Sequence, residues 1–112
     1  MSEYPLKLEE IVAWLRSNDQ VLKNLGITLA DVRESHTNKS AAAANFDSAQ
    51  AVGQICAWVS GEIDFQVLRA SDGKDVFIHH QKVSSLSEPS LESAYKDFLQ
   101  KMTHPDDSSS PV

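Results

Sequence analysis

Apolar and polar residues alternate between Gln50 and Val83 in three runs, and this pattern predicts three β-strands. The expected strands cover residues 51–59, 63–70 and 75–83. β-Branched and aromatic residues are frequent in all three runs, as is typical of strands that pack on one face.

Two turn signals separate these runs, one at Gly61-Glu62 and one at Asp72-Gly73. An Asp-Gly pair between apolar runs is among the strongest short signals for a hairpin, because a type I′ turn needs a positive φ at both central residues. The segment therefore predicts a three-stranded antiparallel meander.

Residues 6–25 carry apolar side chains at helical spacing and predict an N-terminal helix. The sequence Ser17-Asn18-Asp19 weakens this helix, because the three side chains compete for backbone hydrogen bonds, and we expect a break there. Gly26 is a suitable cap for the end of the helix. The apolar stripe consists of Leu8, Ile11, Val12, Leu15 and Leu22.

Between this helix and the meander, residues 27–36 predict a first strand and residues 37–40 a polar turn. The alanine-rich segment 41–46 predicts either a second strand or an irregular edge. Its run of four alanines favours a helix by propensity but is too short to nucleate one between two turn signals.

A second helix is expected to begin at Ser87 or Ser90 and to end near Met102, after a linker over residues 84–89. Its apolar stripe consists of Leu91, Ala94, Tyr95, Phe98, Leu99 and Met102. Residues 103–112 contain almost no apolar side chains, and we predict a disordered tail there.

The order of these elements predicts an α+β fold in a single domain over residues 1–102. An antiparallel meander of three to five strands would be covered on one face by the N- and C-terminal helices.

The assumed turns also predict which residues share a face of the sheet. Two-residue loops at 61–62 and 72–73 would pair Trp58 with Phe65, and Phe65 with His80. A one-residue error in either loop would exchange the faces. The more apolar face, expected beneath the helices with Trp58 as a core residue, consists of Cys56, Trp58, Ile63, Phe65, Val67, Val76 and Ile78. The opposite face is expected to be open, either as a docking surface or as an ordinary solvated face. It consists of Ile55, Ala57, Val59, Asp64, Gln66, Leu68, Phe77, His79 and Gln81.

Charge narrows the class of partner. Sixteen acidic residues against ten basic ones give a formal net charge of −6, which argues against a nucleic-acid partner. The charge indicates either attraction to a basic partner or only the acidic surface that many small soluble proteins have. No apolar run reaches the length of a membrane span, so no membrane partner is expected. A single cysteine and the lack of a secretory pattern in the first residues suit the cytoplasm.

No cluster of residues predicts catalysis, a metal site or a cofactor. Adjacent strand residues point to opposite faces, so His79 and His80 could not chelate one ion. Cys56 lies within an apolar run, where a thiol keeps a high pKa and is typically inert. No glycine-rich phosphate loop is present in the sequence.

The central hairpin carries the sequence Gly53-Gln-Ile-Cys-Ala-Trp58-Val-Ser-Gly-Glu-Ile-Asp64-Phe-Gln-Val, followed by Asp72-Gly73 and by Phe77-Ile-His-His80. With a tryptophan-containing helix before it and a second helix after it, this pattern resembles the TriTu immunity family over residues 8–102. The Trp-x-Ser-Gly-x-x-Asp core is the most specific part of the resemblance, and Cys56 departs from it where an aliphatic residue is expected.

The resemblance implies an antidote without catalytic activity or cofactor. It implies direct binding to a cognate interbacterial toxin, an ADP-ribosyltransferase that modifies the translation factor EF-Tu with NAD, in a 1:1 complex. The alternative is a small acidic adaptor or chaperone for a secreted effector, and a small enzyme is a weaker third possibility. A toxin encoded next to this chain would favour the first hypothesis.

An NAD-dependent transferase must hold a pyrophosphate, so its cleft is expected to be electropositive and to attract carboxylates. We therefore expect Glu62 at the loop tip and Asp64 at the start of the next strand to supply the charged contacts. Gln66, Phe77 and His79 are expected to form the surface that flanks them.

Overall fold

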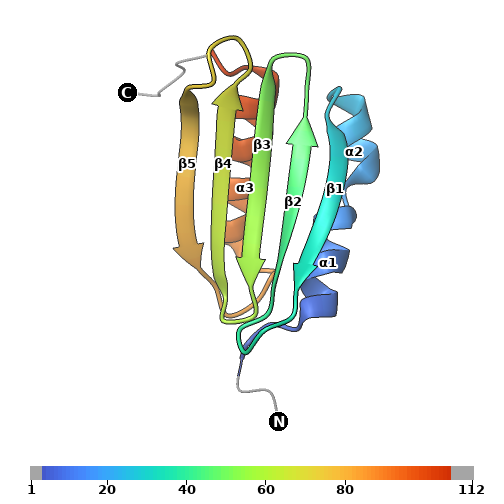
Figure 1. Ribbon diagram of the computed structural model, residues 1–112, viewed down its shortest axis with the longest axis vertical. Helices are drawn as coiled ribbons and strands as arrows, with labels where there is room; N and C mark the ends of the chain where they lie inside the picture. The colour runs from blue at the N-terminus through green and yellow to red at the C-terminus, as the bar shows by residue number, and fades with distance from the viewer. Residues whose placement is uncertain (1–3, 107–112) are drawn as a thin grey trace.

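The computed structural model of the chain describes residues 4–106 and confirms the predicted α+β fold (Figure 1). Five strands form one antiparallel sheet in the order β1-β2-β3-β4-β5, so each strand pairs with its neighbour in sequence. The strands are β1 (Thr28–Ser35), β2 (Ala41–Asp47), β3 (Ala51–Trp58), β4 (Glu62–Arg69) and β5 (Asp75–Lys82).

In the described part of the chain, three helices cover one face of this sheet and leave the other open. They are α1 (Leu8–Arg16), α2 (Asp19–Asn24) and α3 (Pro89–Thr103). Figure 1 looks onto the open face, with α3 behind β3 and β4 and with α1 and α2 behind and beside β1 and β2.

The predicted break in the first helix is confirmed. α1 ends where the hydroxyl of Ser17 donates a 2.8 Å hydrogen bond to the carbonyl of Trp14, the local competition that its sequence predicts. The chain restarts as α2 after Asn18 and leaves that helix through Gly26, whose φ is 74°. A left-handed φ of this kind favours glycine at the end of a helix.

The alanine-rich segment forms a regular strand. Ala42, Ala44 and Phe46 of β2 point to the covered face and are buried, and α1 packs against this strand. Small side chains let the helix approach the sheet closely, which accounts for alanines at strand positions that propensity alone would not favour.

The core lies between the sheet and the three helices. α3 contributes Phe98, whose ring centroid lies 5.2 Å from that of Phe46 and 5.8 Å from that of Phe65. Gly53 lies directly beneath this helix, and a Cβ atom there would be 2.6 Å from the Sδ of Met102 and 2.8 Å from the ring of Phe98. The helix can therefore contact the sheet backbone only because residue 53 has no side chain.

The predicted two-residue turn at 61–62 is wrong, and because of this error the predicted faces of β3 are exchanged. Ala57 pairs with Ile63, so the turn consists of the three residues 59–61. Cys56 and Trp58 therefore lie on the open face instead of beneath the helices. Ile55, Ala57 and Val59, which were expected on the open face, are buried under the helices.

The predicted two-residue turn at 72–73 is also wrong, because β4 ends at Arg69 and Leu68 already pairs with Asp75, so the connection is longer. The predicted faces of β5 are wrong for a different reason. Val67 pairs with Phe77 while Leu68 pairs with Asp75, so Val76 is an extra residue in a β-bulge. Beyond the bulge the pattern of faces is inverted. Phe77, His79 and Gln81 point toward the helices, and Ile78 lies on the open face with 68% of its surface exposed.

In β4 the predicted faces are confirmed. Ile63, Phe65 and Val67 are buried beneath the helices, while Asp64, Gln66 and Leu68 alternate with them on the open face.

The predicted tail begins too early. α3 includes Thr103, Pro105 is buried, and the Asp106 carboxylate lies 2.8 Å from the guanidinium of Arg69. The remainder of the predicted tail, 107–112, lies outside the described residues.

Candidate binding surface

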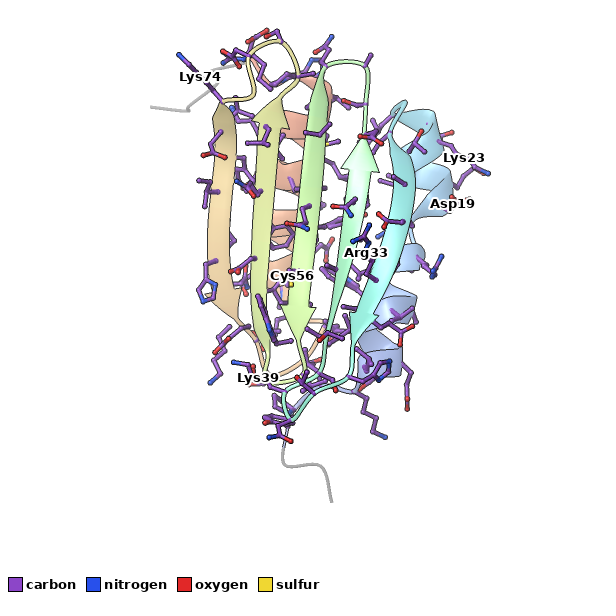
Figure 2. The ribbon with its side chains drawn as sticks, in the orientation of Figure 1. Asp19, Lys23, Arg33, Lys39, Cys56 and Lys74 are labelled. Atoms are coloured by element: carbon purple, nitrogen blue, oxygen red, sulfur yellow. The ribbon has the colours of Figure 1, made fainter. Side chains whose placement is uncertain are left out.

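The face of the sheet opposite the helices, here called the open face, gathers polar, charged and apolar side chains from all five strands (Figure 2). Its lower half in the figures consists of Arg33, Ala41, Ala43, Cys56, Trp58, Glu62, Asp64, His80 and Lys82. Its upper half, where β2 and β4 end and β3 and β5 begin, consists of Asp31, Asn45, Asp47, Val52, Gln54, Gln66, Leu68, Asp75 and Ile78.

The lower half contains the tryptophan of the family-like hairpin pattern. Trp58 is half-buried beside Ala41, its partner in β2. The Nζ of Lys39 lies 6.0 Å from the centroid of the Trp58 ring and 3.1 Å from Oε2 of Glu62. Lys39 thus combines an ion pair with a cation–π contact at the lower end of the sheet, where Figure 2 labels it.

Asp64 and His80 form a second pair in the lower half. The two residues are opposite each other in β4 and β5, and Oδ1 of Asp64 contacts Nδ1 of His80. Cys56 is the neighbour of Asp64 on β3. Burial, and then the negative charge of Asp64, raise the pKa of the Cys56 thiol above its ordinary value. A thiol kept protonated in this way is a poor nucleophile.

In the upper half, hydrogen bonds join charged and amide side chains across the strands. Nδ2 of Asn45 donates to Asp31 at 2.7 Å, and Nε of Arg33 donates to the same carboxylate at 2.9 Å. These two hydrogen bonds, that of Asn45 first, lower the pKa of the Asp31 carboxyl. Nε2 of Gln66 donates to Asp75 at 2.8 Å.

A shallow hollow of about 350 Å³ lies at the centre of the upper half. Val52 and Leu68 supply its apolar side chains, and Asn45, Asp47, Gln54 and Gln66 surround them. The side chain of Val52 is 40% exposed. A hollow of this kind, apolar at its centre and polar at its rim, is typical of the surfaces on which proteins dock.

The residues predicted from sequence as toxin contacts separate into two groups. Glu62, Asp64 and Gln66 lie together on the open face. Phe77 and His79 do not join them, because their rings lie 6.5 Å and 5.8 Å from that of the core residue Phe65 on the covered face. The predicted grouping of all five on one surface is therefore wrong.

Sequence reasoning also missed functional candidates on the open face. Trp58 was assigned to the core, and Asp31, Asn45 and Asp47 could not be placed because the strands that carry them were uncertain. The alternation of β1 and β2 would have placed these three residues on one face, had the bulge between Leu29 and Asp31 been known.

A second hollow lies on the helix side, between the α1–α2 junction and the first half of α3. It measures about 420 Å³ and is lined by residues that include Trp14, Val21, Tyr95 and Glu92. Burial raises the pKa of the Tyr95 hydroxyl. The ring centroids of Trp14 and Tyr95 are 5.8 Å apart, so aromatic packing joins α1 to α3 here.

Within residues 4–106, no three histidine, cysteine or acidic side chains are grouped so that they could hold a metal ion. No helix in this range has the length and apolar character needed to span a membrane.

Comparison with known proteins gives one match. A family model described as "Immunity protein TriTu" matches residues 9–101, from the second residue of α1 to the last turn of α3. Neither the curated proteins nor the solved structures gave a match.

Proposed function

Since the match shows that this chain belongs to the TriTu immunity protein family, a family of non-enzymatic proteins that neutralise toxins, we propose that it binds its cognate toxin through the open face and covers the toxin's active cleft. The observation that carries this proposal is the uncovered sheet itself. All three helices pack on one side, and the other side presents Val52, Trp58 and Ile78 among charged and amide groups.

Such a face suits a protein partner. A sheet face that stays open in a monomer usually alternates cleanly between buried and polar residues. Here the open face retains large apolar side chains, and burying them against a partner would remove apolar area from water. The polar groups between them would fix the orientation of the partner.

We further propose that the toxin is an NAD-dependent ADP-ribosyltransferase that modifies EF-Tu, as the resemblance in the hairpin implies. A cleft that holds the pyrophosphate of NAD is expected to be electropositive, and a chain with a net charge of −6 would be attracted to it. One copy of the chain would cover one toxin, in the cytoplasm where EF-Tu is found. Because the antidote acts by occupancy, it needs no cofactor of its own.

Within the open face, the contact set keeps Glu62, Asp64 and Gln66, which lie at alternate positions of β4. Glu62 and Asp64 belong to its margin, because they are paired with Lys39 and His80 within this chain. Phe77 and His79 are removed from the contact set, because they pack on the covered side.

The proposal is tested by adding purified chain to the toxin domain encoded beside it and measuring the transfer of ADP-ribose from NAD to EF-Tu. Modification should cease near one equivalent of the chain, and raising the concentration of NAD should restore part of it if the cleft is covered. Cells that express the toxin domain should survive only when the chain is co-expressed.

Inhibition that persists when the open face is changed, but is lost when exposed helix-side residues such as Glu92 or Val21 are changed, would contradict the proposed surface. A toxin domain that modifies no EF-Tu, yet is still neutralised, would contradict only the proposed toxin class.

A further inference from the structure

We infer that the upper half of the open face is the main docking site for the toxin, and that it accepts an apolar side chain flanked by lysine or arginine into the hollow over Val52 and Leu68. This inference rests on the proposed function. It specifies which part of the open face binds the toxin and what kind of toxin segment binds there.

The lower half has no unmatched negative charge to offer. Glu62 is paired with Lys39 at 3.1 Å and also faces Lys82 across the β4–β5 pairing. Asp64 contacts His80. A toxin that used these carboxylates would first have to separate them from partners within this chain, which would offset much of the gain.

The upper half, in contrast, carries an excess of negative charge, because its nine residues include three carboxylates and no cationic side chain. Asp31 forms an ion pair with Arg33, which lies where the upper half meets the lower half. Asp75 accepts a hydrogen bond from the neutral amide of Gln66. Asp47 is exposed at the end of β2 and makes no ion pair within residues 4–106. Its charge is therefore available to a partner.

Cations near the upper half do not cancel this charge. The guanidinium of Arg69 is held by Asp72 at 3.1 Å and by Asp106 at 2.8 Å. Lys74 lies in the adjacent turn at the top of Figure 2, beyond the strand positions that surround the hollow. A basic partner approaching the hollow would therefore meet a negative surface, which speeds association and sets orientation.

The apolar part of the upper half gives the partner a place to bury a side chain. Val52 and Leu68 form the apolar floor, and Ile78 stands beside them with 68% of its surface exposed. The amides of Asn45 and Gln54 can donate to or accept from the backbone of the entering segment. An aliphatic or aromatic side chain between two basic residues fits this combination of apolar floor, amide rim and acidic border.

The hollow on the helix side does not combine an apolar floor with unpaired carboxylates. Its acidic residue Glu92 is already paired with Lys96 at 3.4 Å, and Glu88 accepts hydrogen bonds from the backbone N–H groups of Ser84 and Ser85. Charge complementarity therefore favours the open face as the site of a basic partner.

The test compares three charge reversals that change the net charge equally: Asp47→Lys in the upper half, Glu62→Lys in the lower half and Glu92→Lys on the helix side. The probe is the neighbouring toxin domain, made inactive by substitution and immobilised for kinetic binding. Circular dichroism and thermal melting establish that each variant is folded.

Asp47→Lys should weaken binding at least about tenfold, mainly through slower association, and the loss should shrink as ionic strength rises. Glu92→Lys should bind within about twofold of the unchanged chain, since an exposed charge on the far side is screened. Val52→Ser, which changes no charge and removes apolar surface from the hollow, should also weaken binding, through faster dissociation.

If Asp47→Lys and Val52→Ser bind normally while Glu62→Lys loses affinity, the inference is overturned but the open face remains the docking surface. If only Glu92→Lys loses affinity, both the inference and the proposed surface are wrong.

Discussion

The ammonium group of Lys39 lies 6.0 Å from the centre of the Trp58 ring, on the face of the sheet that no helix within residues 4–106 covers. Trp58 is therefore a surface aromatic with a cationic neighbour and not a member of the core. This position changes what its removal should do to the protein.

Replacing Trp58 with alanine should lower the free energy of unfolding by about 1 kcal/mol, since it removes a half-buried ring and one cation–π contact. Replacing the buried Phe65 should cost about 3–5 kcal/mol, as for other large core residues. Urea unfolding of the two variants measures both values. Equal losses would place Trp58 in the core after all.

Gly53→Ala should destabilise the protein by about 1–2 kcal/mol, because the new Cβ would lie 2.6 Å from the Sδ of Met102 and force α3 to shift. The matched control is the same substitution in a Met102→Ala background, where the first clash is gone. There Gly53→Ala should cost less than it does alone. Equal costs in the two backgrounds would show that Met102 is not the side chain that presses on residue 53.

The Asp31 carboxyl should make the stability of the folded protein depend on pH in the acidic range. Its pKa is lowered in the folded state by Asn45 and then Arg33, so its contribution is present above the unfolded value near 3.8 and is lost as pH falls through the folded value. The urea midpoints of the unchanged chain and Asp31→Asn should differ at about pH 6 and converge toward about pH 2.5. A difference that does not change with pH would mean that Asp31 is not held in its charged form by these partners.

Cys56 should react slowly with thiol reagents in the folded protein. Burial, and next Asp64, raise the pKa of its thiol, so the thiolate is scarcer at about pH 8 than in the unfolded chain. Asp64→Asn should accelerate the reaction, and Glu62→Gln, at the next open-face position of β4, should not. The rate of modification by a chromogenic disulfide measures the effect. Faster reaction in the native protein than in urea would contradict this assignment.

Much of the fold followed from local sequence signals. The apolar stripe of α3, the presence of a turn around Gly73 (though not its length) and the competing side chains around Asn18 each depend on a few residues, so a single sequence is enough to identify them. The family resemblance rested on the same hairpin.

The register of the β3–β4 hairpin could not be predicted from local sequence signals, because residues distant in the chain determine it. The carbonyl of Val59 accepts a 3.1 Å hydrogen bond from the backbone of Leu6, and the carbonyl of Gly61 accepts one at 2.8 Å from Val83. A Cβ at Gly61 would lie 2.1 Å from the carbonyl oxygen of Val83. The three-residue turn is thus held by segments from both ends of the fold, and the shift it causes exchanges the faces of β3.

The candidate surface depends on that register. Once Cys56 and Trp58 are placed on the open face and Phe77 and His79 beneath the helices, the charged residues of β4 keep their position while their neighbours change. The bulge at Val76 lies on an edge strand, and no sequence signal at that residue distinguishes it from a regular strand position.

Protection of Cys56 by the toxin is the most direct test that the open face is the binding surface. Cys56 is the only cysteine of the chain and lies in the middle strand of that face, where Figure 2 labels it. Alkylation is followed by mass spectrometry at about pH 8.5, where more of the thiol is ionised, with and without a saturating amount of an inactive, cysteine-free toxin domain. The control is Ser93→Cys in a Cys56→Ser background, which places the thiol on the exposed side of α3.

Binding through the open face should slow alkylation of Cys56 at least about tenfold and leave the thiol of the Ser93→Cys control unaffected. An unchanged rate at Cys56 with saturating toxin, or protection of the α3 thiol instead, would contradict the account.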